Sequence, residues 1–203
     1  MVGSGGMTRI IAGAAKGRRL AVPPGTGTRP TSDRGREGLF ASLVSIRGSL
    51  RQARVLDLYA GSGAVGLEAL SRGAERVILV ESDARAAGVI RANIETVGLP
   101  GASVKTSAVA RVLTRGPAEP PFDLVVADPP YAAGEEEITA MLVALTRHGW
   151  LAPGALVTVE RATRSAPLTW PPGYVPYRSR RYGEATFWYG HAAGTGPAPG
   201  AKT

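Results

Sequence analysis

The chain has 203 residues, of which 44% are hydrophobic and 20% are charged, a composition typical of one globular domain. It contains no cysteine and only two histidines, His148 and His191, so neither a disulfide framework nor a metal centre is expected. No apolar run approaches the ~20 residues of a membrane span, and we expect a cytoplasmic protein without a membrane partner.

The net charge of +8 is concentrated in the first quarter of the chain. Residues 1–54 contain ten basic and two acidic residues, whereas the 14 basic and 14 acidic residues that follow cancel. This asymmetry favours a local surface for a polyanion, and a solvated basic face is the simpler alternative. The candidate nucleic-acid-binding residues are Arg9, Lys16, Arg18, Arg19, Arg29, Arg34 and Arg36.

The first thirty residues divide into a leader and a small extension. Residues 1–6 precede a second methionine, Met7, and we set them aside as a leader. Residues 7–30 hold short apolar pieces around Gly13 and Gly17, which predicts a small β-hairpin extension. Because this segment is basic, we expect it to bind RNA. Thr31 or Ser32 can then cap a helix, because the apolar spacing that follows is helical.

Residues 31–191 are expected to form one α/β domain. Apolar strands are predicted at 55–59, 77–80, 104–106, 124–127 and 156–159, and amphipathic helices at 64–72, 84–97 and 135–147. Apolar strands that alternate with helices indicate a mostly parallel, doubly wound sheet. Residues 177–189 predict a closing antiparallel hairpin with its turn at 182–184. The tail, residues 192–203, is rich in Gly, Ala and Pro and is expected to be disordered.

A glycine loop connects the first predicted strand to its helix. Glycines let the backbone approach a cofactor, and the helix N-terminus offers free amide donors. The spacing also fits a dinucleotide site. A carboxylate before the loop, however, would repel a pyrophosphate and could hold the ammonium of S-adenosylmethionine. The pattern therefore favours this cofactor, with candidate binding residues Asp57, Tyr59, Gly61, Ser62 and Gly63.

Two further strand ends add candidate cofactor residues. Glu81 ends the second strand, where an acidic side chain can accept hydrogen bonds from both ribose hydroxyls, and Ser82 lies beside it. Asp83 is expected to cap the next helix instead of binding a ligand. After the third strand, Ser107 and Ala108 are placed to contact an adenine ring.

The run Asp128-Pro129-Pro130-Tyr131 follows the fourth strand and supplies the candidate catalytic residues. An exocyclic base amine is a poor nucleophile because its lone pair is delocalised into the ring. Asp128 and the carbonyl of Pro129 can accept its two N–H groups and aim the nitrogen at a methyl donor. Pro130 stiffens the loop, and Tyr131 offers a ring on which an extruded base can stack. This loop indicates methyl transfer to an amino group.

These motifs together resemble the RsmD family of 16S ribosomal RNA guanine-N2 methyltransferases, over almost the whole chain. The resemblance implies a seven-stranded Rossmann-like fold with an N-terminal hairpin. It also implies S-adenosylmethionine as cofactor and methylation of guanine 966 of 16S rRNA, in the 30S subunit or an assembly intermediate. Besides the glycine and Asp128 loops, it rests on RIIAG at 9–13, KGRRL at 16–20, RPTSDRGREGLF at 29–40 and YGEA at 182–185.

Several alternatives stay open at this stage. A methyltransferase acting on adenine N6 or on protein glutamine would share the Asp128 loop, although the basic first quarter argues against a protein substrate. A nicotinamide-dependent dehydrogenase could use the glycine loop, but Asp57 and the Asp128 loop disfavour it. A non-catalytic rRNA-binding assembly factor could keep the same pocket without turnover.

Overall fold

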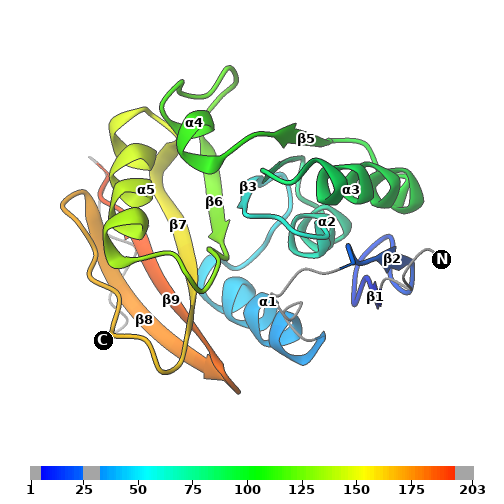
Figure 1. Ribbon diagram of the computed structural model, residues 1–203, viewed down its shortest axis with the longest axis horizontal. Coiled ribbons are helices and arrows are strands. Elements are labelled where there is room, and N and C mark those ends of the chain that lie inside the picture. The colour runs from blue at the N-terminus through cyan, green and yellow to red at the C-terminus, as the bar shows by residue number, and fades with distance from the viewer. Residues whose placement is uncertain (1–5, 25–32, 195–203) are drawn as a thin grey trace.

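The computed structural model describes residues 6–24 and 33–194. A twisted sheet with helices on both faces forms the body of the molecule, and a small hairpin packs beside α2 and α3 (Figure 1). In these residues no helix is long and apolar enough to cross a membrane. The same residues contain no group of three His, Asp or Glu side chains that could hold a metal ion.

The sheet has seven strands, as the family resemblance implies, and their order is β5-β4-β3-β6-β7-β9-β8. Neighbouring strands pair in parallel from β5 (Ala102–Thr106) through β4 (Arg76–Glu81), β3 (Arg54–Leu58) and β6 (Phe122–Ala127) to β7 (Leu151–Ala162). The strand β9 (Ala185–Ala192) is antiparallel to both β7 and β8 (Tyr174–Tyr182). The order reverses between β3 and β6, and such a switch point opens a crevice at the carboxyl ends of the strands.

Two separate cores lie on the two faces of the sheet. Beneath α1 (Asp33–Arg47), α2 (Ala64–Ser71) and α3 (Ala84–Val97), one core joins side chains such as Phe40 and Leu67 to one side of the strands. The other core lies under α4 (Val109–Leu113) and α5 (Glu135–Arg147) and includes the buried side chain of Trp150. The helices α2, α3 and α5 begin and end within one residue of their predicted bounds, whereas the short α4 was not predicted.

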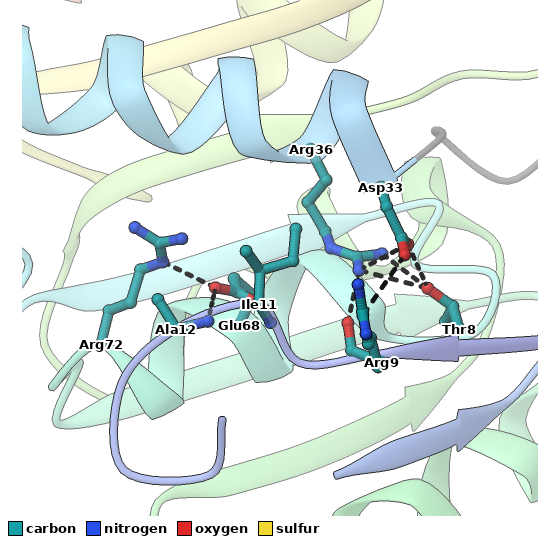
Figure 2. A network of polar contacts seen from close by, with 8 residues as sticks. All are labelled: Thr8, Arg9, Ile11, Ala12, Asp33, Arg36, Glu68 and Arg72. Carbon is teal, nitrogen blue, oxygen red and sulfur yellow. Dashed lines mark hydrogen bonds and ion pairs between the residues drawn. The ribbon is translucent and has the colours of Figure 1, made fainter. Parts of the chain in front are cut away.

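The N-terminal hairpin pairs β1 (Met7–Arg9) with β2 (Arg19–Ala21) and shares the core beneath α2 and α3 through Ile10 and Leu20. Its turn is joined to α2 by polar contacts (Figure 2). The fully buried carboxylate of Glu68 accepts the backbone N–H groups of Ile11 (2.7 Å) and Ala12 (3.0 Å). The hairpin is therefore an integral part of the domain.

Gly13 is required where the hairpin turn meets the end of α2. Its φ is +86°, and a Cβ at this position would lie 1.9 Å from the carbonyl oxygen of Ser71. The close approach lets Ala14 donate to that carbonyl (2.8 Å), while the Ser71 hydroxyl donates to Ala12 (2.6 Å). Carbonyl groups at a helix C-terminus lack partners within the helix, and the turn supplies one.

Asn93 of α3 connects the hairpin to the glycine loop. Its side-chain amide donates to the carbonyls of Ala21 and Ser62 (2.9 Å each) and accepts the N–H of Ala21 (2.9 Å). The side chain is buried with these hydrogen bonds made, so it fixes β2 and the loop relative to one another.

Two boundaries differ from the sequence expectation. Ala192 belongs to β9 and Ala193 donates to the carbonyl of Gly173 (2.8 Å), so the ordered sheet extends past the predicted start of the tail at 192. β7 is also longer than its predicted core of four residues, because residues 160–162 pair with β9 and Leu151 pairs with Phe122 of β6. The predicted cap at Thr31 or Ser32 and the rest of the tail lie outside the described residues.

Candidate active site

Four carboxylates lie at the carboxyl ends of four neighbouring strands, on the face that α1, α2 and α3 cover. Side chains alternate between faces along a strand, so Val55, which packs beneath these helices, places Asp57 on the same side two residues later. In the same way, Glu81 and Asp128 lie two residues after the core residues Leu79 and Val126, and Glu160 lies four residues after Leu156.

The glycine loop after β3 turns sharply over Asp57. Tyr59 and Gly61 have positive φ angles of 60° and 56°, a conformation that is strained for a tyrosine. Asp57 accepts the N–H of Gly66 (2.8 Å), and Glu81 accepts the N–H of Gly61 (2.9 Å). Both carboxylates therefore hold the loop in place and also face the space above it.

That space is a cavity of about 350 Å³ between the glycine loop, α1 and the ends of β6 and β7. A Cβ on Gly61 would meet no atom within 4 Å, so the loop backbone is accessible from this side. Asp128, Pro130 and Glu160 line the opposite wall. Six of the predicted cofactor-binding residues line the cavity: Asp57, Tyr59, Gly61, Ser62, Glu81 and Ser82.

Three predicted cofactor-binding residues do not line this cavity. Gly63 lies under the loop, where a Cβ would be 3.0 Å from a methyl group of Leu79, so its role is to let the loop pack on the core. Ser107 donates its N–H to the carbonyl of Glu81 (2.9 Å), and Ala108 precedes α4. Asp83 caps α3 by accepting the N–H of Ala86 (2.7 Å), as predicted.

The Asp128 loop follows β6 directly. Asp128 is still paired to β3 through its N–H, which donates to Leu58 (3.3 Å), and the loop closes where Ala133 donates to the carbonyl of Pro130 (2.8 Å). A second, smaller hollow is lined by all four predicted catalytic residues, Asp128, Pro129, Pro130 and Tyr131, and also by Glu160. Tyr131 is 58% exposed, so its ring is available to a ligand at the mouth of the hollow.

The site is electrostatically tuned for positive charge. Burial raises the pKa of Asp57 to about 7, and the charge of Glu81 acts in the same direction. Burial also raises the pKa of Asp128 well above its ordinary value, with further increases from Glu160 and Asp57. Since buried carboxylates repel one another and lack solvation, a cation in this cavity would stabilise their charged forms.

Glu160 is the site residue that the sequence reasoning missed. It is 9% exposed, lies at the wall between the two hollows and lines both of them. A sequence signal existed, because an acid directly follows the apolar stretch 156–159 just as Glu81 follows Val80.

The predicted basic surface is present in part. Arg9, Lys16 and Arg34 are exposed and line a hollow between the hairpin and α1. Arg18 and Arg19 are exposed on the hairpin, and Arg18 donates to the carbonyl of Thr96 (2.6 Å). Arg29 lies outside the described residues.

Arg36 does not belong to this exposed surface, which corrects the sequence expectation. Its side chain is buried and donates to the hydroxyl of Thr8 (3.2 Å), the carbonyl of Arg9 (2.5 Å) and the carboxylate of Asp33 (3.1 Å) (Figure 2). It thereby joins α1 to β1. Arg36 also lines the cavity, and within the described part of the chain its Nε has no hydrogen-bond partner.

The sequence is similar to a known family and to curated proteins over almost its whole length. The family model described as "Conserved hypothetical protein 95" matches residues 8–191. "Ribosomal RNA small subunit methyltransferase D" of Escherichia coli K12 is 38% identical over 183 residues, which cover 90% of this chain and 88% of that one. The protein of the same name in Haemophilus influenzae is 35% identical over 184 residues, covering 90% and 92%.

Solved structures share the fold. One from Escherichia coli has a TM-score of 0.81 at 34% identity and covers 94% of this chain and 100% of that one. Magnesium protoporphyrin IX methyltransferase from Synechocystis, solved with bound S-adenosylmethionine, has a TM-score of 0.60 at 18% identity, covering 78% of each chain. The α/β fold is thus that of S-adenosylmethionine-dependent methyltransferases.

Proposed function

We propose that this chain methylates small-subunit ribosomal RNA with S-adenosylmethionine as methyl donor. The chain belongs to the family described as "Conserved hypothetical protein 95", the RsmD family, and the proposal starts from that membership. More finely, we propose that the acceptor is the exocyclic N2 amine of a guanine, guanine 966 by the family resemblance, in the 30S subunit or an assembly intermediate. The observation that carries this proposal is the Asp128 loop beside an acidic, cofactor-sized cavity. A cytoplasmic location follows from the proposed substrate.

The residues around the cavity fit S-adenosylmethionine. This cofactor carries a sulfonium, an ammonium and a carboxylate, and when bound it supplies an electrophilic methyl group. The carboxyl groups of Asp57 and Asp128 line this cavity, and the two cationic groups would stabilise their charged forms. The buried Nε of Arg36 suits the carboxylate, because this N–H lacks a partner in the described residues and charge-assisted hydrogen bonds are the stronger kind. Glu81 would accept the ribose hydroxyls.

The Asp128 loop supports transfer to an amino nitrogen. The Asp128 carboxylate and the Pro129 carbonyl would accept the two N–H groups of the amine and direct its lone pair toward the methyl group. Pro130 keeps the turn rigid and has no N–H that could compete for these acceptors. The exposed ring of Tyr131 would stack on the base after it leaves the RNA, a contact worth about 1–3 kcal/mol.

The exposed basic residues support RNA as the substrate. Arg9, Lys16 and Arg34 line one hollow together with Asp33 and Glu37, and Arg18 and Arg19 add exposed positive charge on the hairpin. Through Asn93 the hairpin is bonded to the glycine loop, so RNA held by the hairpin would be held at a fixed position relative to the cofactor. Phosphate contacts of this kind orient a nucleic acid without reading its sequence.

The test is nucleoside mass spectrometry of 16S rRNA from a strain that lacks this gene, after incubation with the purified protein and S-adenosylmethionine. We expect N2-methylguanosine to appear with the wild-type protein and not with Asp128→Ala. Free rRNA and 30S subunits are compared to identify the substrate form. Methylated adenine, methylated protein glutamine or no product would contradict the proposal, and the last outcome would favour a non-catalytic assembly factor.

A further inference from the structure

We propose that Glu160 selects guanine as the target base by accepting a hydrogen bond from its ring N1–H. This inference rests on the proposed function and names the residue that gives it base specificity. Glu160 would act on recognition, while Asp128 and Pro129 act on the reacting amine.

The strand register places Glu160 next to Asp128. Ala127 of β6 pairs with Val159 of β7, so the following residues, Asp128 and Glu160, lie side by side on parallel strands. Neighbouring strands are about 4.8 Å apart. Within a guanine the exocyclic amine and N1–H are adjacent on one edge, so two carboxylates at this spacing can each reach one of them.

Glu160 also lies where the base would enter. It lines the larger cavity, which would hold the cofactor, and the hollow under Tyr131, which would hold the base. Asp128 and Pro130 are the other two residues that line both. On β9, Phe187 pairs with Glu160 and also lines the cavity, so the acid stands beside an apolar wall. A hydrogen bond to a carboxylate at such a site is little weakened by water.

The chemistry of the bases then gives selectivity. Guanine presents a donor at N1, whereas adenine presents a lone pair there, which would face the Glu160 carboxylate as acceptor against acceptor. A site built to receive an N–H disfavours an analogue that presents a lone pair at the same position, because the two acceptors repel one another and no hydrogen bond forms between them. A protein glutamine has no ring N–H, so it would also leave Glu160 without this partner.

A substitution in the RNA isolates this contact. In 16S rRNA ligated from two pieces, the target position carries either guanine or 2-aminopurine, which keeps the 2-amino group, presents a lone pair at N1 and lacks the O6 oxygen. Wild-type kcat/KM should favour guanine by about 100-fold or more. Glu160→Gln can donate its amide N–H to that lone pair, so we expect the preference to narrow at least tenfold. The intrinsic difference in reactivity between the two bases is the same for both enzymes, so it cancels when the guanine preference of the wild type is divided by that of Glu160→Gln.

Controls separate this role from neighbouring ones. Glu95→Gln, an exposed change on α3, should keep the wild-type preference. Asp128→Asn should lower turnover on both RNAs without changing the ratio of kcat/KM for guanine to kcat/KM for 2-aminopurine. Calorimetry with S-adenosylmethionine should give similar affinities for the wild type and Glu160→Gln, since the recognised group belongs to the base.

An unchanged preference for guanine over 2-aminopurine in Glu160→Gln would overturn the inference. A preference that narrows in Asp128→Asn and not in Glu160→Gln would also overturn it. If Glu160→Gln does not fold, Glu160→Asp replaces it: the shortened acid should lose activity on guanine and little on 2-aminopurine, and equal losses would overturn the inference. Wild-type protein that methylates no guanine contradicts the proposed function itself, a result distinct from these.

Discussion

The buried carboxylate of Glu68 allows a quantitative test of how the N-terminal hairpin is held. Glu68 is 0% exposed and accepts hydrogen bonds from the N–H groups of Ile11 and Ala12 and from Nε of Arg72 (2.7 Å) (Figure 2). Glu68→Gln keeps the side-chain volume and one acceptor oxygen. Its amide N–H₂ would instead face groups that are themselves donors, so at least one buried N–H loses its partner.

The magnitude follows from these contacts. An unpaired buried donor costs about 1–3 kcal/mol, and removing one partner of a buried ion pair costs about 3–5 kcal/mol. Arg72 is 20% exposed, so water can compensate it in part. We therefore expect Glu68→Gln to lower the free energy of unfolding by about 2–4 kcal/mol. For a chain of this size, that corresponds to a Tm lower by roughly 5–15 °C.

Urea unfolding followed by circular dichroism measures this loss, and hydrogen exchange locates it. The amides of Ile11 and Ala12 should lose protection in Glu68→Gln, while amides of the central strands keep theirs in proportion to global stability. Glu75→Gln, an exposed change nearby, is the matched control and should alter stability by less than about 0.5 kcal/mol. If Glu68→Gln is as stable as this control, the reasoning about the hairpin is wrong.

Four further results are expected. Asp128→Asn should reduce kcat by about 10²-fold or more with the fold intact, and near wild-type turnover in single-turnover assays would refute its role. Glu81→Ala should weaken S-adenosylmethionine binding by roughly 1.5–3 kcal/mol, and calorimetry that shows an unchanged affinity would contradict its role. Burial raises the pKa of Asp57 from 3.8 to about 7, so the folded cofactor-free protein keeps a proton that the unfolded chain loses. Its stability should therefore fall as pH rises from about 4 to 7, and Asp57→Asn should flatten this dependence in pH-dependent unfolding. Replacing Arg18 and Arg19 by Ala should reduce the slope of log affinity against log salt by roughly 1.4–1.8 if each contacts one phosphate, and an unchanged slope would indicate a solvated face.

Local pattern was sufficient for the central fold. The period of apolar residues determined the bounds of α2, α3 and α5 and the positions of the central strands, because burial of one helical stripe or of both strand faces leaves a direct trace in the sequence. The cap at Asp83 and the closing hairpin at Gly183 were predictable for the same reason: each depends on residues within a few positions. Placing Asp57, Glu81 and Asp128 at one edge required only the rule that parallel strands end on the same side.

Only the tertiary structure decided which polar residues are buried and by what they are bound. In the sequence, Arg36 is one of several basic residues of the first quarter. Its side chain is buried in the structure because it binds Thr8 and Arg9, which lie 28 and 27 positions away. Glu68 likewise binds a turn 57 positions away, and Glu160 reaches the site only because β7 is registered against β6. A charged side chain has no periodicity of its own, so its burial follows from partners that distant parts of the chain bring to it.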